Sequence, residues 1–375
     1  MPEIPFSTLA PTTAEVRAEV EAGWRRILDG GSYVGGVEVD RFEHSFAGFC
    51  DRRHAVGVAN GTDALHLILR GLGIGPGDEV LVPANTFIAT AEAVLLAGAR
   101  PRFVDVDPRT LLMSAQAAAD AVTPATAAVI AVHLYGHVAD LGGLREVAHR
   151  FGLAFVEDAA QAHGASRDGT AAGAAGVAAA FSFYPGKNLG AFGDGGAVVT
   201  DDAALADRVR SLANHGRSEV DRYIHERVGM NSRLDALQAV VLSAKLRHLP
   251  AWTAARRTVV DAYREQLRDA PLRLVEPEPG VVSAWHLLVA RTSSRDHVRR
   301  ELAASGIETG IHYPLPCPAQ PAFRQWSDGS FPVATAAAAE VLSLPLHPHM
   351  TSGDVATVCA GLRAALASED AGARA

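Results

Sequence analysis

The chain has 375 residues, of which 48% are hydrophobic and 20% charged, so it can bury a large core and lacks the composition of a disordered protein. Its net charge of -8 and pI near 6.0 disfavour a general nucleic-acid-binding protein, which normally carries a basic surface. We find no purely apolar run of about 18 or more residues that would span a membrane, and residues 1–10 lack the basic cluster of a signal peptide.

The three cysteines, Cys50, Cys317 and Cys359, are odd in number, far apart and without metal-ligand spacing. We therefore expect reduced thiols in a cytoplasmic protein, and no metal site.

From about Thr12 to His248, short apolar runs alternate with amphipathic helices, a pattern typical of a parallel sheet covered on both faces. Helices are predicted to begin near Thr12 and Gly61. The strands are predicted at 54–58, 79–82, 102–106, 127–134, 153–156, 178–183 and 197–200. A helix over 234–249 closes this part, and Pro250 is predicted to end it.

Beyond Pro250 the pattern changes to a helix over 259–267, a Pro-rich stretch over 271–279 and a strand over 285–290. A helix capped by Ser294, a short strand over 309–312 and two further helices follow. The sequence thus predicts an α/β protein with a large domain over 13–250 and a smaller α+β domain over 251–375. Residues 1–12 are expected to pack on the smaller domain.

Three polar motifs follow predicted strands, and ligands bind at that edge of an open parallel sheet. The first, Gly61-Thr62-Asp63, begins a helix, where free backbone N–H groups and the helix dipole can bind a phosphate. An ordinary turn with a helix cap would give the same three residues.

The second motif places Asp158 at the end of a buried strand, where a carboxylate is costly unless a cation meets it. A protonated pyridine nitrogen would serve, as in enzymes that use pyridoxal 5'-phosphate (PLP). The alternative is an aspartate that caps the next helix.

The third motif is a Pro/Gly loop that carries Lys187. The chain contains two lysines among 34 basic residues, so a lysine here is a notable choice. Burial beyond a strand end would lower its pKa and make it a nucleophile toward an aldehyde. The other lysine, Lys245, lies within a predicted helix, and we expect its amine to reach the surface.

At these motifs the sequence resembles the DegT/DnrJ/EryC1/StrS family of sugar aminotransferases, from about Ile4 to about Leu366. The matching segments are NGTDAL (60–65), PANTFIAT (83–90), VHLYG (132–136), EDAAQAHG (157–164), FSFYPGKNLG (181–190) and GMNSRLDALQ (229–238). Six motifs in the family's order make the resemblance specific.

The resemblance implies the aspartate-aminotransferase fold, PLP fold type I, with a mostly parallel seven-stranded sheet, and a homodimer with shared active sites. It implies that Lys187 forms a Schiff base with PLP and that Asp158 pairs with the pyridine nitrogen. The remaining cofactor contacts that it implies are Phe87 and Gln161 on the ring, Gly61, Thr62, Asp63 and Ser182 at the phosphate, and Asn231 from the partner subunit.

The implied reaction is ping-pong transfer of an amino group from an amino acid, usually L-glutamate in this family, to a nucleotide-linked keto-sugar, with pyridoxamine 5'-phosphate as the intermediate cofactor form. The pattern is most similar to enzymes that act on dTDP-3-keto-6-deoxyhexoses in deoxyamino-sugar and antibiotic biosynthesis. Sugars with a 4-keto group or a UDP carrier are alternatives. Candidate substrate contacts, each equally compatible with a structural role, are His163, Tyr184, Arg217, Tyr223, Arg233, His312 and Tyr313.

Two other classes of function are open to this fold. Sugar dehydratases of the family look like aminotransferases whose Schiff-base lysine is replaced, so Lys187 disfavours a dehydratase or epimerase. A non-catalytic regulator is the second alternative, but nothing in the chain resembles an added DNA-binding domain.

Overall fold

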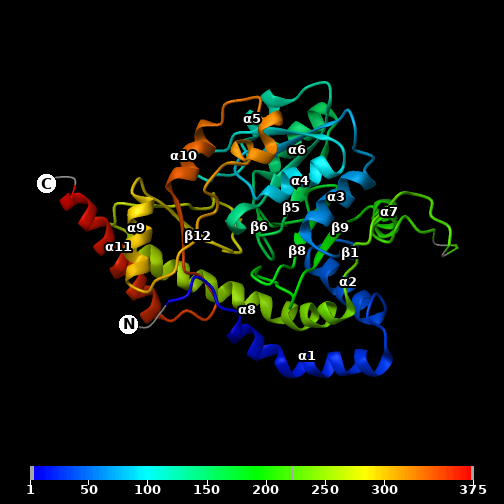
Figure 1. Ribbon diagram of the computed structural model, residues 1–375, viewed down its shortest axis with the longest axis horizontal. Helices are drawn as coiled ribbons and strands as arrows, with labels where there is room; N and C mark the ends of the chain where they lie inside the picture. The colour runs from blue at the N-terminus through cyan, green and yellow to red at the C-terminus, as the bar shows by residue number, and fades with distance from the viewer. Residues whose placement is uncertain (1–3, 219, 222, 373–375) are drawn as a thin grey trace.

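A seven-stranded sheet crosses the larger part of the computed structural model, which describes residues 4–218, 220–221 and 223–372 (Figure 1). Its strand order is β1-β9-β8-β5-β4-β2-β3, and β9 runs antiparallel to both of its neighbours while the other pairs are parallel. The strands are β1 (His54–Val58), β2 (Glu79–Pro83), β3 (Arg100–Val104), β4 (Thr126–Val132), β5 (Ala154–Asp158), β8 (Ala178–Ser182) and β9 (Gly196–Thr200). The mostly parallel seven-stranded sheet is therefore confirmed.

The central strands consist of apolar residues on both faces because helices cover the sheet on each side. In β4, Val129 and Ile130 are adjacent and point to opposite faces, and both are fully buried. The helices of this part are α1 (Ala10–Gly30), α2 (Val37–Phe49), α3 (Gly61–Gly71), α4 (Ile88–Leu96), α5 (Ala115–Ala121), α6 (Leu141–Phe151) and α7 (Ala203–Ala213). The sequence reading did not find α2, which buries Phe42 and Phe46.

The helix α8 (Ala236–Leu267) corrects the prediction that Pro250 ends a helix. It passes through Pro250 without a break and runs along the base of the molecule beside α1 (Figure 1). Proline removes one backbone hydrogen bond, but its ring faces solvent here. Leu249 and Trp252 on either side of it are buried, so packing of the helix continues across the proline.

The C-terminal part holds a second sheet in the order β10-β12-β13 and a second hydrophobic cluster. Ile4 belongs to this cluster and forms a bridge with Ile307. The elements are β10 (Arg273–Leu274), β12 (Leu288–Arg291), β13 (Val341–Leu344), α9 (Arg295–Ala304), α10 (Pro332–Glu340) and α11 (Ser352–Gly372). The division into domains at residues 250 and 251 stays a prediction.

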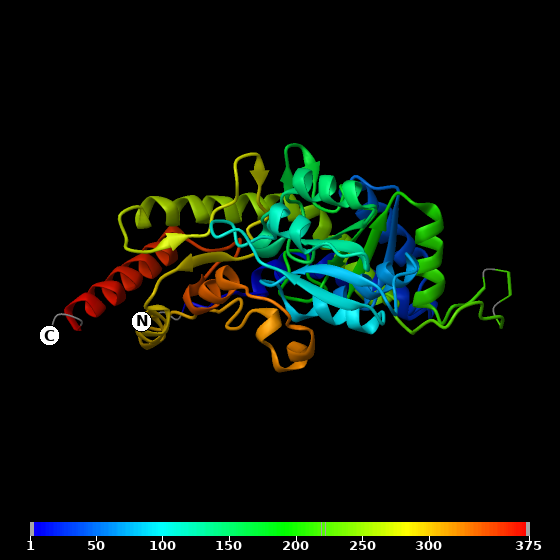
Figure 2. The same cartoon turned by 90° about the horizontal axis from the view of Figure 1, so that it is seen from above.

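Smaller elements complete the fold. A three-stranded sheet joins β11 (Val281–Val282) to β6 (Ser166–Arg167) and β7 (Thr170–Ala171), and short 3-10 helices span Leu134–Gly136, Cys317–Ala319 and Pro321–Trp326. Seen from above, α11 and the segment after α7 extend from opposite ends of the molecule (Figure 2). No helix in the described part of the chain has the length and apolar character needed to cross a membrane.

Two predicted strands of the C-terminal part differ from the structure. Residues 309–312 contribute only an isolated bridge from Gly310 to Ser343, and the chain then enters the cavity lining at His312 and Tyr313. The strand predicted over 285–290 begins at Leu288 instead. Trp285 has a φ of 46°, a left-handed conformation that interrupts an extended strand. The residues between Trp285 and Leu288 are thereby free to face the large sheet.

Candidate active site

A cavity of about 560 Å³ opens where the strands of the large sheet end. One wall comes from residues at or just after the carboxyl ends of β1, β2, β4, β5 and β8, and the opposite wall comes from α8 and the C-terminal part. The sequence-predicted residues that line this cavity are Gly61, Thr62, Phe87, Asp158, Gln161, Ser182, Tyr184, Lys187, His312 and Tyr313.

The N-terminus of α3 forms one end of the cavity. Asn60 caps the helix by accepting a hydrogen bond from the N–H of Asp63 at 2.8 Å. The N–H groups of Gly61 and Thr62 have no acceptor among the described residues, and the Ser182 hydroxyl lies beside them. A Cβ at Gly61 would lie 2.8 Å from the Cβ of Ser182, so only glycine leaves this cradle open. These donors suit a phosphate.

Two adjacent carboxylates end β5 and point to opposite faces of the sheet. Glu157 is fully buried, lies 2.9 Å from Nε2 of His133, and accepts hydrogen bonds from the N–H groups of Gly173, Ala175 and Gly176. Burial alone would raise the pKa of Glu157, but these hydrogen bonds lower it. The Glu157 carboxylate is satisfied inside the protein.

Asp158, in contrast, faces the cavity and has no ion-pair partner within the described part of the chain. Its carboxylate accepts hydrogen bonds from the Thr90 hydroxyl at 2.8 Å and from the N–H of Ala160 at 3.2 Å. The Thr86 hydroxyl lies 2.8 Å from that of Thr90 and extends this chain of hydrogen bonds. A buried carboxylate held this way still needs a cation, which the protonated ring nitrogen of PLP would provide.

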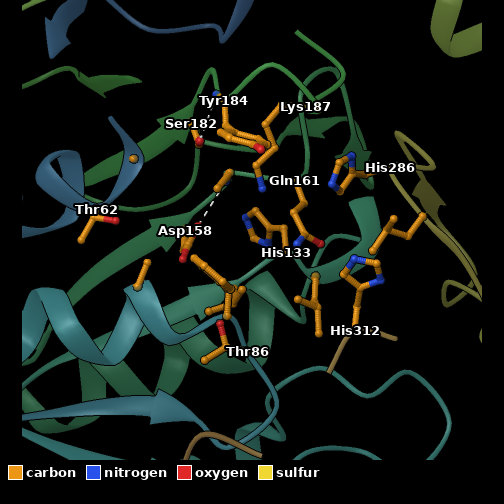
Figure 3. A pocket seen from close by; sticks show the side chains of 18 of the residues that line it. Thr62, Thr86, His133, Asp158, Gln161, Ser182, Tyr184, Lys187, His286 and His312 are labelled. Carbon is orange, nitrogen blue, oxygen red and sulfur yellow. Dashed lines mark hydrogen bonds between the residues drawn. The ribbon is translucent and has the colours of Figure 1, made fainter. Parts of the chain in front are cut away.

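Lys187 presents its amine to the same cavity from the loop after β8 (Figure 3). Burial lowers the pKa of this amine to about 8, although the negative charge of Asp158 acts in the opposite direction. About a tenth of the amine is therefore neutral at pH 7, roughly 300-fold more than at the ordinary lysine pKa of 10.5, and nucleophilic attack on a carbonyl requires this neutral form.

The second lysine corrects the prediction of a surface side chain. Lys245 on α8 is 3% exposed, and its amine donates a hydrogen bond to the carbonyl of Gly190 at 2.7 Å. The amine also lies 4.6 Å from the centre of the Phe192 ring. Because Gly190 lies on the same loop as Lys187, both lysines of the chain contribute to one structural unit.

Flat surfaces line the middle of the cavity. The Gln161 side chain accepts a hydrogen bond from the N–H of Tyr135 at 2.6 Å and donates one to the Tyr313 hydroxyl at 3.3 Å, so its amide plane is fixed. The Phe87 ring, half of it exposed, lies 5.7 Å from the Tyr313 ring. An aromatic cofactor ring can pack between such surfaces.

Two histidines lie on the side of Lys187 away from Thr62 (Figure 3). His312 has Nδ1 2.8 Å from the Ser343 hydroxyl, and burial together with the charge of Lys187 lowers its pKa to about 4. His286 has Nδ1 3.1 Å from the Asn188 side chain, and burial lowers its pKa well below the usual value. Sequence reasoning missed His286 because it expected a regular strand there.

Two predicted residues lie outside the cavity lining. The carboxylate of Asp63 accepts a hydrogen bond from the Ser232 hydroxyl at 2.6 Å. His163 is fully buried with its ring 5.3 Å from that of Phe181 and 5.9 Å from that of Phe183. Burial and the charge of Lys187 lower the pKa of His163 to about 3, so it is a neutral packing residue beneath the site.

The remaining candidates lie on or next to the segment that projects beyond α7 (Figures 1 and 2). Arg217, Tyr223, Asn231 and Arg233 do not line the cavity of their own chain. Arg233 donates a hydrogen bond to the Asn231 side chain at 2.9 Å, and both residues are exposed.

Comparison with known proteins agrees with this site. The model of the DegT/DnrJ/EryC1/StrS aminotransferase family matches residues 14–363. The chain belongs to this family. Among its curated relatives, the "Erythromycin biosynthesis sensory transduction protein EryC1" of Saccharopolyspora erythraea is 49% identical over 96% of this chain and 99% of its own length.

Other relatives carry enzyme names. The "dTDP-3-amino-3,4,6-trideoxy-alpha-D-glucose transaminase" of Streptomyces venezuelae is 48% identical over 93% of this chain and 92% of its own. The "UDP-N-acetyl-3-dehydro-alpha-D-glucosamine 3-aminotranferase" of Acidithiobacillus ferrooxidans is 44% identical over 97% of this chain and 98% of its own.

Solved structures show the same fold and the cofactor. S. venezuelae DesV in complex with a ketimine intermediate superimposes with a TM-score of 0.94 at 47% identity, over 97% of this chain and 98% of that one. NtdA from Bacillus subtilis, solved with the cofactor PMP, has a TM-score of 0.90 at 29% identity, over 98% of this chain and 86% of that one. This member of the family is thus a PLP-dependent aminotransferase, and the aspartate-aminotransferase-like fold is confirmed.

The burial of Lys245 gives a first testable outcome. We expect Lys245→Ala to lower the free energy of unfolding by about 2–4 kcal/mol, because it removes the bond to Gly190 and leaves a cavity. Urea unfolding measures this change. Arg247→Ala, at an exposed position of the same helix, is the control and should change stability by less than about 0.5 kcal/mol. Equal effects of the two variants would show that Lys245 is a surface residue.

The lowered pKa of Lys187 gives a second testable outcome. Covalent capture of PLP by the cofactor-free protein needs the neutral amine, so its rate should rise with pH and level off above about pH 8. Stopped-flow absorbance between pH 6 and 10.5 follows this rate. A rate that keeps rising toward the ordinary lysine pKa of 10.5 would contradict the burial argument.

Proposed function

We propose that this chain transfers an amino group from L-glutamate to the keto carbon of a dTDP-3-keto-6-deoxyhexose in deoxyamino-sugar and antibiotic biosynthesis. The observation that carries the proposal is the grouping of Lys187 and Asp158 in one cavity with the phosphate cradle at α3. A dehydratase or a non-catalytic regulator would not need a nucleophilic amine in this place. One relative, 49% identical, is named a sensory protein, but the buried amine of Lys187 supports a catalytic role for this chain.

Each group in the cavity has a place in this reaction. Gly61, Thr62 and Ser182 would hold the cofactor phosphate, and Asp158 would keep the ring nitrogen protonated. Bound PLP supplies an electron sink for the carbon that loses or gains a proton. Phe87 and Gln161 would enclose its ring.

The Lys187 amine has two tasks in this proposal. It holds the cofactor between reactions, and once the donor displaces it, it carries a proton between the donor carbon and the cofactor. The lowered pKa suits both tasks, because the amine can release and accept a proton close to neutral pH.

The proposal also specifies which nucleotide carries the sugar and which carbon bears the keto group. The relative named for a dTDP-linked trideoxy sugar supports dTDP, whereas the relative named for a UDP-linked sugar is only slightly less similar, at 44% against 48% identity. Both printed names place the amino group at C3, which supports a 3-keto rather than a 4-keto substrate.

We also propose a cytoplasmic homodimer in which Asn231 and the segment after α7 reach the partner's site. That segment exposes large apolar side chains at Val220 (97% exposed), Val228 (83%) and Ile224 (53%), which a partner surface would cover. The cytoplasm accords with the three cysteines, which are buried free thiols.

The visible spectrum of the purified protein tests the proposed half-reaction. We expect a yellow band with bound PLP that L-glutamate converts to the pyridoxamine form, and that the correct keto-sugar restores. Lys187→Ala should keep its far-ultraviolet circular dichroism and lose turnover by about 10²- to 10⁴-fold or more. A band that glutamate leaves unchanged would contradict the donor, and multiple turnovers by the variant would contradict the role of Lys187.

Mixed dimers test the shared site. We expect the Lys187→Ala homodimer to be inactive. We expect the Asn231→Ala homodimer to bind the cofactor more weakly than the wild type. A mixed dimer of the two variants would contain one site with an intact Lys187 and an intact Asn231 from the partner. Activity should therefore recover toward half of the wild-type value per dimer. Absence of recovery would place Asn231 in the site of its own chain.

A further inference from the structure

Arg256 is a buried cation that the sequence reading did not single out. It lies on α8, is 7% exposed, and lines the cavity on the same wall as His286 and Leu346. Its Nη1 group donates hydrogen bonds to the carbonyls of Leu346 at 3.0 Å and Trp285 at 3.3 Å. A guanidinium carries five N–H donors, so these two neutral acceptors leave most of its donor capacity unused.

No carboxylate among the described residues compensates this charge. Arg256 forms no ion pair with any residue that the structure describes, although a buried charge without a partner is costly. Burial lowers the pKa of Arg256 to about 10, so the side chain is charged at neutral pH. The neighbouring side chains do not offset this positive charge, because His286 and His312 are neutral and the nearby Lys187 is itself cationic when protonated.

The position of Arg256 relative to Lys187 restricts the anion that it can meet. Both residues line the main cavity and also a small recess of about 20 Å³ behind it, and the charges of both act on His286. In an amino acid the carboxylate carbon is one bond from the carbon that bears the amine. The α-carboxylate of a donor whose amine approaches Lys187 therefore stays close to Lys187, within reach of residues that line the same space, and Arg256 is the arginine among them.

The other anions of the reaction have different places. The cofactor phosphate fits the cradle at Gly61 and Thr62, and Thr62 lies on the other side of the pocket from His286 (Figure 3). The nucleotide diphosphate belongs to a much larger molecule, which needs the open mouth of the cavity where Phe87 and Tyr184 are 51% and 61% exposed. The nearly enclosed guanidinium of Arg256 suits a small anion.

We propose that Arg256 binds the α-carboxylate of the amino donor and thereby selects an amino acid for the first half-reaction. This inference rests on the aminotransferase function proposed above and adds the group that recognises the donor. Charge-assisted hydrogen bonds from arginine to a carboxylate supply both the affinity and the orientation that the half-reaction needs.

The test compares Arg256→Gln with Arg257→Gln. Arg257 is the next residue on α8, lies outside the cavity lining, and bonds the carbonyl of Ser283 at 3.4 Å. We expect Arg256→Gln to lower kcat/KM for the L-glutamate half-reaction by about 10- to 100-fold, as loss of a hydrogen bond to a charged group predicts. Arg256→Lys should recover part of this loss, and Arg257→Gln should leave the half-reaction unchanged.

Two binding measurements separate the possible roles. Calorimetry with 2-oxoglutarate should show weaker binding to Arg256→Gln than to the wild type, whereas the affinity for dTDP should be unchanged. Weaker dTDP binding with unchanged 2-oxoglutarate binding would assign Arg256 to the diphosphate and overturn the proposal. If Arg256→Gln does not fold, the charge-retaining Arg256→Lys carries the same comparison.

The outcome also distinguishes this inference from the proposed function. If the wild-type protein binds PLP but does not react with L-glutamate, the proposed donor fails. If the wild type reacts and Arg256→Gln has an unchanged glutamate kcat/KM, the proposed function stands and the role of Arg256 is wrong.

Discussion

The active site depends on the Asp158 carboxylate, which has no ion-pair partner within the part of the chain that the structure describes. Glu157 and Asp158 are neighbours on one strand, yet Glu157 has Arg52 at 4.0 Å and hydrogen bonds with His133 and three backbone N–H groups. Asp158 receives two hydrogen bonds from the described residues and has no ion-pair partner among them. Strand geometry produces this difference, because adjacent side chains face opposite sides of the sheet. One carboxylate therefore stabilises the fold, and the other is available to a cationic ring.

The distribution of positive charge follows from the same constraint. Lys187, Lys245 and Arg256 lie buried around the loop after β8, and burial lowers the pKa of each. A lowered lysine pKa is a cost to stability, because the unfolded chain binds a proton that the folded chain holds less tightly. Burial of Lys187 costs stability and makes its amine more nucleophilic. Burial of Lys245 also costs stability, and its amine holds the loop through the bond to Gly190.

The sequence was sufficient to predict one wall of the site, but of the other wall it indicated only His312 and Tyr313. Gly61, Asp158 and Lys187 each follow a strand with a clear apolar pattern, and the parallel order of those strands brings their ends together. Arg256 and His286 come from segments whose local pattern carries no such information. Their places depend on a helix that continues through Pro250 and on the left-handed turn at Trp285, both of which tertiary packing decides.

The two walls accordingly serve different parts of the chemistry. The strand ends supply groups that any PLP enzyme of this fold needs, namely a phosphate cradle, a carboxylate and an amine. The helix α8 and the C-terminal part supply Arg256, His286 and His312, which line the part of the cavity that the cofactor would leave open to substrates. Under the proposals above, selection among substrates is a property of this second wall. Because α8 contributes both Lys245 and Arg256, one helix holds the loop that carries Lys187 and places a second cation in the lining of the same cavity.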